Sequence, residues 1–181
     1  MVHHTLSLLI KTVVSGSLFL LTVPAIATPI GNEQYVFDRA PRIVRLTSNF
    51  HQTNQSGDTY QLVISIPENA GAPLQAIRST QPDDQEAIVF QSDETRIFAD
   101  NSATEIAQVS IGGTENANDL LIVLHHPVQP GQTVTFYLKP ERNPSQAGVH
   151  LLGITAYPNG KNSPGLFLGY SRLTFHAPNG R

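Results

Sequence analysis

The chain has 181 residues, a formal net charge of −3 at pH 7, no cysteine and no tryptophan. This length fits one domain, and the slightly acidic balance is not that of a nucleic-acid-binding domain. The absence of cysteine excludes disulfides, a thiol nucleophile, a blue-copper centre and the lipid attachment used by bacterial lipoproteins.

Residues 1–27 have the pattern of a secretory signal peptide. An apolar, uncharged run follows Lys11, Pro24 interrupts it, and Ala25 and Ala27 supply the small residues that signal peptidase requires. The run is shorter than the roughly 20 residues that a membrane-spanning helix needs. We therefore expect cleavage after Ala27 and no membrane span in the mature protein. Its location would be extracytoplasmic: periplasm, cell surface, medium or thylakoid lumen.

Residues 28–40 contain Pro29 and Gly31 and indicate a loose leader, after which a β-sandwich domain is expected over 41–178. Within 59–66, one face is expected to carry Tyr60, Leu62, Ile64 and Ile66, and the other Gln61, Val63 and Ser65. This period of two is that of a half-buried strand. The run 120–125 is continuously apolar, which favours a central strand. Candidate strands lie over 42–48, 59–66, 74–80, 87–91, 96–99, 105–111, 120–125, 133–139, 149–157 and 167–175.

These short segments are separated by turns rich in Gly and Pro, such as Pro130-Gly131. Only residues 101–108 suggest a helical turn, with Asp100 or Ser102 as its cap. The pattern predicts an all-β fold: a single antiparallel, immunoglobulin-like β-sandwich of 7–9 strands, preceded by the helix of the signal peptide.

Two stretches of the sequence resemble an uncharacterised family of exported cyanobacterial proteins, domain of unknown function 2808. The first is TYQLVISIPENAGAPLQAI at 59–77. The second is VQPGQTVTFYLKPERNP at 128–144, followed by GVHLLGITAYPNG and GLFLGYSRLTFH. The resemblance covers most of 36–176. It implies a cyanobacterial or related photosynthetic source and an extracytoplasmic home, and it implies no catalytic residue.

Metal binding has candidate ligands but no motif. The residues after the leader include no His-x-His pair and no His-Glu-x-x-His helix. His125 and His126 fit the end of a strand before Pro127, and the alternative is a zinc or copper site that one of them forms with His150 or His176. We expect no cofactor.

The residues most suggestive of ligand binding are Tyr157, Tyr170 and Arg172. An exposed Tyr157 or Tyr170 would suit a sugar, although tyrosines in strands more often pack against the sheet. If the face of Arg172 is covered, its guanidinium requires acceptors, and a clamp on the loop at Asn143 or a nearby acid is then expected. Gly169 to Leu173 lacks the final glycine of a serine nucleophile elbow, so no catalytic residue is predicted.

Charge is spread unevenly along the chain. Residues 83–119 hold nine acids and one base, whereas 139–181 hold five bases and one acid. Two differently charged surfaces keep a protein soluble, and they can also dock a partner. The sequence therefore predicts a non-catalytic exported module that contacts a protein or the cell envelope, with a carbohydrate- or metal-binding module as the alternative.

Overall fold

Eight β-strands form in the computed structural model, which describes residues 34–100 and 119–178. The predicted signal peptide with Ala25 and Ala27, the strand expected over 105–111 and the helical turn over 101–108 lie outside these residues. The strands are β1 (Arg42–Ser48), β2 (Tyr60–Ser65), β3 (Leu74–Thr80), β4 (Phe90–Ala99), β5 (Leu120–Val128), β6 (Thr133–Pro140), β7 (Gly148–Pro158) and β8 (Leu166–Phe175). In the described part of the chain, no helix is long and apolar enough to cross a membrane.

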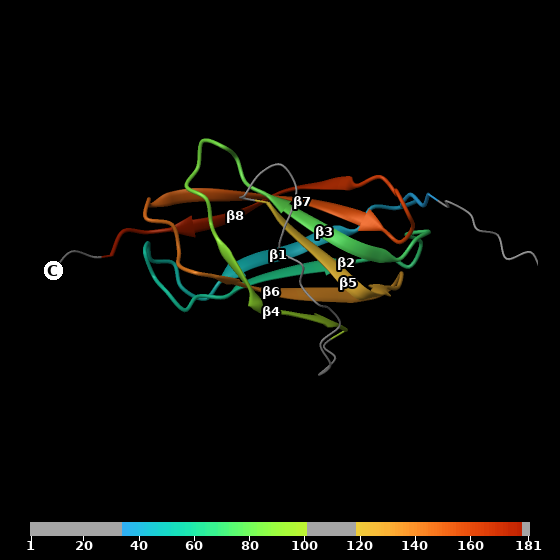
Figure 1. Cartoon of the computed structure of the whole chain (residues 1–181), viewed down its shortest axis with the longest axis horizontal. Coiled ribbons are helices and arrows are strands. Elements are labelled where there is room, and N and C mark those ends of the chain that lie inside the picture. Colours follow the sequence, from blue (N-terminus) through green and yellow to red (C-terminus); the bar gives the residue numbers. More distant parts are fainter. Residues whose placement is uncertain (1–33, 101–118, 179–181) are drawn as a thin grey trace, which may run out of the picture. The chain divides into compact units, whose positions relative to one another are not determined.

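The strands form two antiparallel four-stranded sheets that face each other (Figure 1). One sheet has the order β1-β2-β6-β4, and the other has the order β5-β3-β7-β8. If β5 is set aside, the seven remaining strands have the two-sheet order of an immunoglobulin constant domain. β5 is then an additional edge strand, placed in the sequence between the fourth and fifth strands of that arrangement. The expected all-β, immunoglobulin-like sandwich is confirmed.

Alternating side chains of the inner strands build the core. Tyr60, Leu62 and Ile64 of β2 pair in register with Leu138, Phe136 and Val134 of β6, and all six side chains are fully buried. The other sheet contributes a matching apolar face to the same cluster, including Ile77, Ile122, Leu152, Ile154 and Leu173. Side chains from the two inner faces thus form one continuous core between the sheets.

Two expectations about individual strands are wrong. Segments 87–91 and 96–99 were expected as separate strands, but Phe90–Ala99 is one strand, β4, whose pairing with β6 shifts between Gln91 and Arg96. The apolar run 120–125 favoured a central strand, yet β5 is an edge strand and Val123 is exposed. A strand is central only if it has a neighbouring strand on each side and covering layers on both faces, and an apolar run does not show that these are present.

Candidate functional site

A groove lies on the side of the sandwich where the edge strands β1 and β8 face each other across the two sheets. Its volume is about 490 Å³, and residues of both strands line it. Ile43, Leu46 and Leu168 contribute apolar side chains that pack against the core. The exposed residues at its rims include Arg42, Arg45, Tyr170 and Arg172.

The rim from β8 is shaped by a bulge. Gly169 pairs with Ile154, but the next partner of β7, Thr155, pairs with Phe167, so Leu168 is an extra residue. This insertion lets Phe167 and Tyr170, three residues apart, project on the same outer face of the sheet. Their rings meet edge to face at a centroid distance of 5.3 Å, and the side chains are 52% and 59% exposed.

A glycine opposite this bulge makes room for the aromatic pair. Gly153 of β7 pairs with Tyr170, and a Cβ atom at Gly153 would lie 3.0 Å from Tyr170 Cε1 and 3.2 Å from Phe167 Cε2. The same atom would be 2.7 Å from Thr80 Oγ1 of β3. Both rings therefore lie close over backbone, where any other residue would crowd them.

The rim from β1 carries two arginines on one face for the same reason. Pairing with β2 shifts between Ile43 and Arg45, so Val44 is an extra residue and Arg42 and Arg45 both lie on the outer side of the strand. Arg45 Nη2 donates a 3.0 Å hydrogen bond to Gln61 Oε1. Sequence reasoning missed both arginines, because a strict two-residue period places positions 42 and 45 on opposite faces.

Three arginines line the groove, and none of its described lining residues carries a carboxylate. The three are Arg42, Arg45 and Arg172. Among residues 34–100 and 119–178, the guanidinium groups of Arg42 and Arg172 have no hydrogen-bond or ion-pair partner. Guanidinium groups that present free donors at a recess favour carboxylate, sulfate or phosphate groups.

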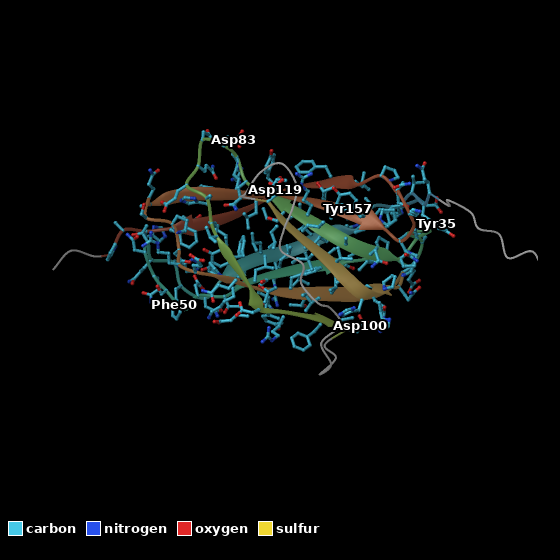
Figure 2. The ribbon with its side chains drawn as sticks, in the orientation of Figure 1. Tyr35, Phe50, Asp83, Asp100, Asp119 and Tyr157 are labelled. Carbon is cyan, nitrogen blue, oxygen red and sulfur yellow. The ribbon has the colours of Figure 1, made fainter. Side chains whose placement is uncertain are left out.

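The structure separates the three predicted binding residues. Tyr170 and Arg172 share the groove. Tyr157, labelled in Figure 2, is instead half-buried on β7. A Cβ atom at Gly165 would lie 2.6 Å from Tyr157 Cε1, so the ring packs closely against this glycine. Near it, Arg78 Nε of β3 donates a 3.0 Å hydrogen bond to Asp119 Oδ2. This bond is the main cause that raises the pKa of Arg78, with Tyr157 contributing less.

The predicted metal ligands do not form a cluster. His125 and His126 are exposed near the end of β5, while His150 is buried on β7 with its ring 5.6 Å from that of Phe175. His176 follows β8 and lines a second recess with His51. No group of three or more side chains suited to a metal ion occurs among the described residues.

The loop between β1 and β2 is fixed by a buried polar network rather than by Arg172. Asn143, expected as the target of an Arg172 clamp, accepts a 2.8 Å hydrogen bond from the Tyr60 hydroxyl and donates to Phe50 O and Gln52 O. Phe50 marks this end of the sandwich, and Tyr35 marks the other (Figure 2). Arg172 is exposed in the groove instead, where its guanidinium faces solvent.

One family model matches the chain. Its description is "Protein of unknown function (DUF2808)", and it matches residues 34–175, which include all eight strands. No curated protein sequence matches the chain.

Several solved structures resemble the chain at low identity. A collagen-binding domain from a Staphylococcus aureus adhesin is 9% identical, with a TM-score of 0.39 over 74% of this chain and 97% of that one. The bacterial hydrophobin BslA is 11% identical, with a TM-score of 0.43 over 78% and 98%. An uncharacterised protein from Nocardia farcinica with an immunoglobulin-like fold is 11% identical, with a TM-score of 0.42 over 72% and 97%. Likenesses this weak give no information about ligand or activity.

Proposed function

Because the chain belongs to the DUF2808 family, whose description names no activity, we propose from its own groove that it is a non-catalytic binding module. It acts outside the cytoplasm and uses the groove between β1 and β8 to hold an anionic partner in the cell envelope. The observation that carries the proposal is the presence of Arg42, Arg45 and Arg172 in one recess beside the exposed ring of Tyr170.

The chemistry of these side chains supports binding rather than catalysis. Arginine keeps its charge at any physiological pH and donates hydrogen bonds in a fixed planar geometry, so it recognises anions without exchanging protons. General acid–base catalysis instead needs a group that titrates near the working pH and reaches the reacting atom. The described lining of the groove contains no His, Asp, Glu, Cys or Lys.

The location outside the cytoplasm rests on residues 1–27. The apolar run, Pro24 and the small residues Ala25 and Ala27 support export and cleavage. N-terminal sequencing of protein recovered from cells that express the full chain tests this directly. We expect the mature protein to begin at Thr28 and to be found outside the cytoplasm. A cytoplasmic protein that keeps Met1 would contradict the proposal.

Binding is tested by co-sedimentation of the exported protein with an isolated envelope fraction. The groove variant replaces Arg42, Arg45 and Arg172 by Gln. The control variant replaces Lys139, Arg142 and Lys161 by Gln, and these residues line neither described recess. Both variants change the net charge equally. We expect the wild type and the control to sediment and the groove variant to stay in the supernatant. Equal sedimentation of both variants, or no sedimentation of the wild type, would overturn the proposal.

A further inference from the structure

The groove points to a ligand class, and this inference rests on the function proposed above. We propose that the groove binds an acidic polysaccharide: a sugar ring packs against Tyr170, while Arg42, Arg45 and Arg172 bind carboxylate or sulfate groups along the chain.

The charge of the groove selects for an anion. Its three guanidinium groups come from two opposite rims, β1 and β8, so a ligand that lies along the groove can contact both sides. Arg45 is held in place by Gln61, which in turn donates to the Tyr137 hydroxyl at 3.3 Å. Planar guanidinium forks match carboxylate and sulfate groups bidentately. A repeating acidic polymer supplies such groups at regular intervals.

The aromatic ring in the groove favours a sugar over a simple inorganic anion. Tyr170 is 59% exposed although it belongs to a strand, and Phe167 and Gly153 fix its position. A ring held in place at the surface loses little conformational entropy when a ligand packs on it. The C–H groups of a pyranose present a flat apolar face that suits the electron-rich face of an aromatic ring.

The edges of the two strands disfavour the alternative of an acidic peptide added as a further strand. Strand addition needs a regular run of unpaired backbone donors and acceptors. Both strands carry a bulge within the groove, at Val44 of β1 and at Leu168 of β8, and Gly169 next to it has a φ of 120°. Bulges and charged side chains are features that protect sheet edges from pairing. The site therefore recognises its ligand through side chains rather than backbone.

Titration calorimetry of the mature exported protein tests the ligand class. The probes are a polyuronate, a sulfated glucan, the unmodified glucan and polyglutamate. We expect binding to the polyuronate, the sulfated glucan or both, with an affinity that falls as salt rises, and at least tenfold weaker binding to the glucan and to polyglutamate. The comparison of the two acidic glycans tells carboxylate from sulfate recognition. Binding to polyglutamate as tight as to either acidic glycan would overturn the inference.

Variants separate the contributions of charge and ring. Arg172→Gln is expected to weaken binding about tenfold, the loss of one charged hydrogen-bonding group. Tyr170→Ala is expected to weaken it about fivefold, and Tyr170→Phe to restore it, because the ring rather than the hydroxyl makes the contact. Lys161→Gln and Tyr157→Ala, outside the groove, serve as matched controls. If these controls weaken binding as much as the groove variants do, the site is elsewhere and the inference fails.

Competition with the wild-type protein gives a result that depends on no variant. We expect free polyuronate or sulfated glucan to release the protein from the envelope fraction, and the neutral glucan to leave it bound. Should the wild type bind the envelope through the groove but resist both acidic glycans, the polysaccharide inference fails while the proposed binding function stands. A wild type that never binds the envelope would remove both.

Discussion

The hydroxyl of Tyr60 donates a 2.8 Å hydrogen bond to Asn143 Oδ1, and both side chains are fully buried. This bond joins the start of β2 to the chain just after β6. Because Asn143 also donates to Phe50 O and Gln52 O, at 3.2 and 3.0 Å, the pair anchors the loop between β1 and β2. Burial, and to a smaller extent the charge of Asp58, raises the pKa of the Tyr60 hydroxyl, so it remains a donor throughout the neutral range.

Removal of this hydroxyl should destabilise the domain. Tyr60→Phe leaves Asn143 Oδ1 buried without its donor, which is expected to lower the free energy of unfolding by about 1–3 kcal/mol in a urea titration. The control is Tyr137→Phe. The Tyr137 hydroxyl accepts a longer, partly buried hydrogen bond from Gln61, and its removal should lower the free energy of unfolding by less than about 1 kcal/mol. If both variants lose the same free energy of unfolding, the buried hydrogen bond contributes no more to stability than the partly buried one.

Asp58 should be a second strong contributor to stability. Its buried carboxylate accepts hydrogen bonds from Ser48 Oγ at 2.6 Å and from the backbone N–H groups of Asn49, Phe50 and Thr59. Asp58→Ala removes all these acceptors and is expected to lower the free energy of unfolding by about 2–4 kcal/mol. The exposed Asp84 provides the comparison, since Asp84→Ala should change it by less than about 0.5 kcal/mol. A similar, small change in both would contradict the assignment.

The hydrogen bonds of Glu86 should make the stability of the domain depend on pH in the acid range. Glu86 Oε2 accepts hydrogen bonds from the hydroxyl and the N–H of Ser145, at 2.6 and 2.7 Å. The hydroxyl bond is the largest cause that lowers the pKa of Glu86 below its ordinary value of 4.5. Because the folded pKa lies below the unfolded one, the resulting stabilisation is present above the unfolded pKa and is lost as pH falls through the folded pKa.

NMR titration of the Glu86 carboxyl group checks this effect. Ser145→Ala should raise the pKa of Glu86 toward its ordinary value. The variant should therefore lose less free energy of unfolding than the wild type as the pH falls. Ser163→Ala serves as the control, since Ser163 Oγ instead accepts a hydrogen bond from the backbone N–H of Tyr35. An unchanged titration of Glu86 in the Ser145 variant would show that another group sets its pKa.

A side chain at Gly169, next to the bulge of β8, should strain the backbone and destabilise the domain. The φ of 120° at Gly169 lies in a region that residues with a Cβ rarely adopt, and no neighbouring atom lies within 4 Å of a Cβ built there. Gly169→Ala is therefore expected to lose about 1–3 kcal/mol of stability through strain alone. Ser171→Ala, two residues along the same strand, should stay within about 0.5 kcal/mol. If both variants melt alike, the bulge tolerates a side chain.

A Cβ at Gly153 should disturb the aromatic pair by crowding instead of backbone strain. Gly153→Ala places the new atom against Thr80 Oγ1 and the rings of Tyr170 and Phe167, and overpacking of this kind costs about 1–3 kcal/mol. Near-ultraviolet circular dichroism should report the displaced rings. Gly165→Ala, which crowds Tyr157 instead, tests whether any such signal is specific to the pair. A Gly153 variant with an unchanged spectrum would contradict the close packing.

Much of the fold followed from local patterns in the sequence. The alternation at Tyr60, Leu62 and Ile64 predicted a buried face, and these three side chains are buried, because a strand turns successive residues to opposite faces. Turns rich in Gly and Pro separated the strands and excluded long helices. These signals depend only on neighbouring residues, so they need no knowledge of pairing.

The site was decided by contacts between distant parts of the chain. The sequence indicated Tyr170 and Arg172 but not Arg42 or Arg45, which the pairing shift in β1 brings to the rim of the same groove. No residue in 42–48 marks that bulge, because a bulge is defined by which residues of the partner strand are opposite. For the same reason the sequence could suggest a histidine cluster that the described residues do not form, and could not tell that β5 lies at an edge. The sequence determined the strands, and only the packing of the two sheets decided which side chains meet.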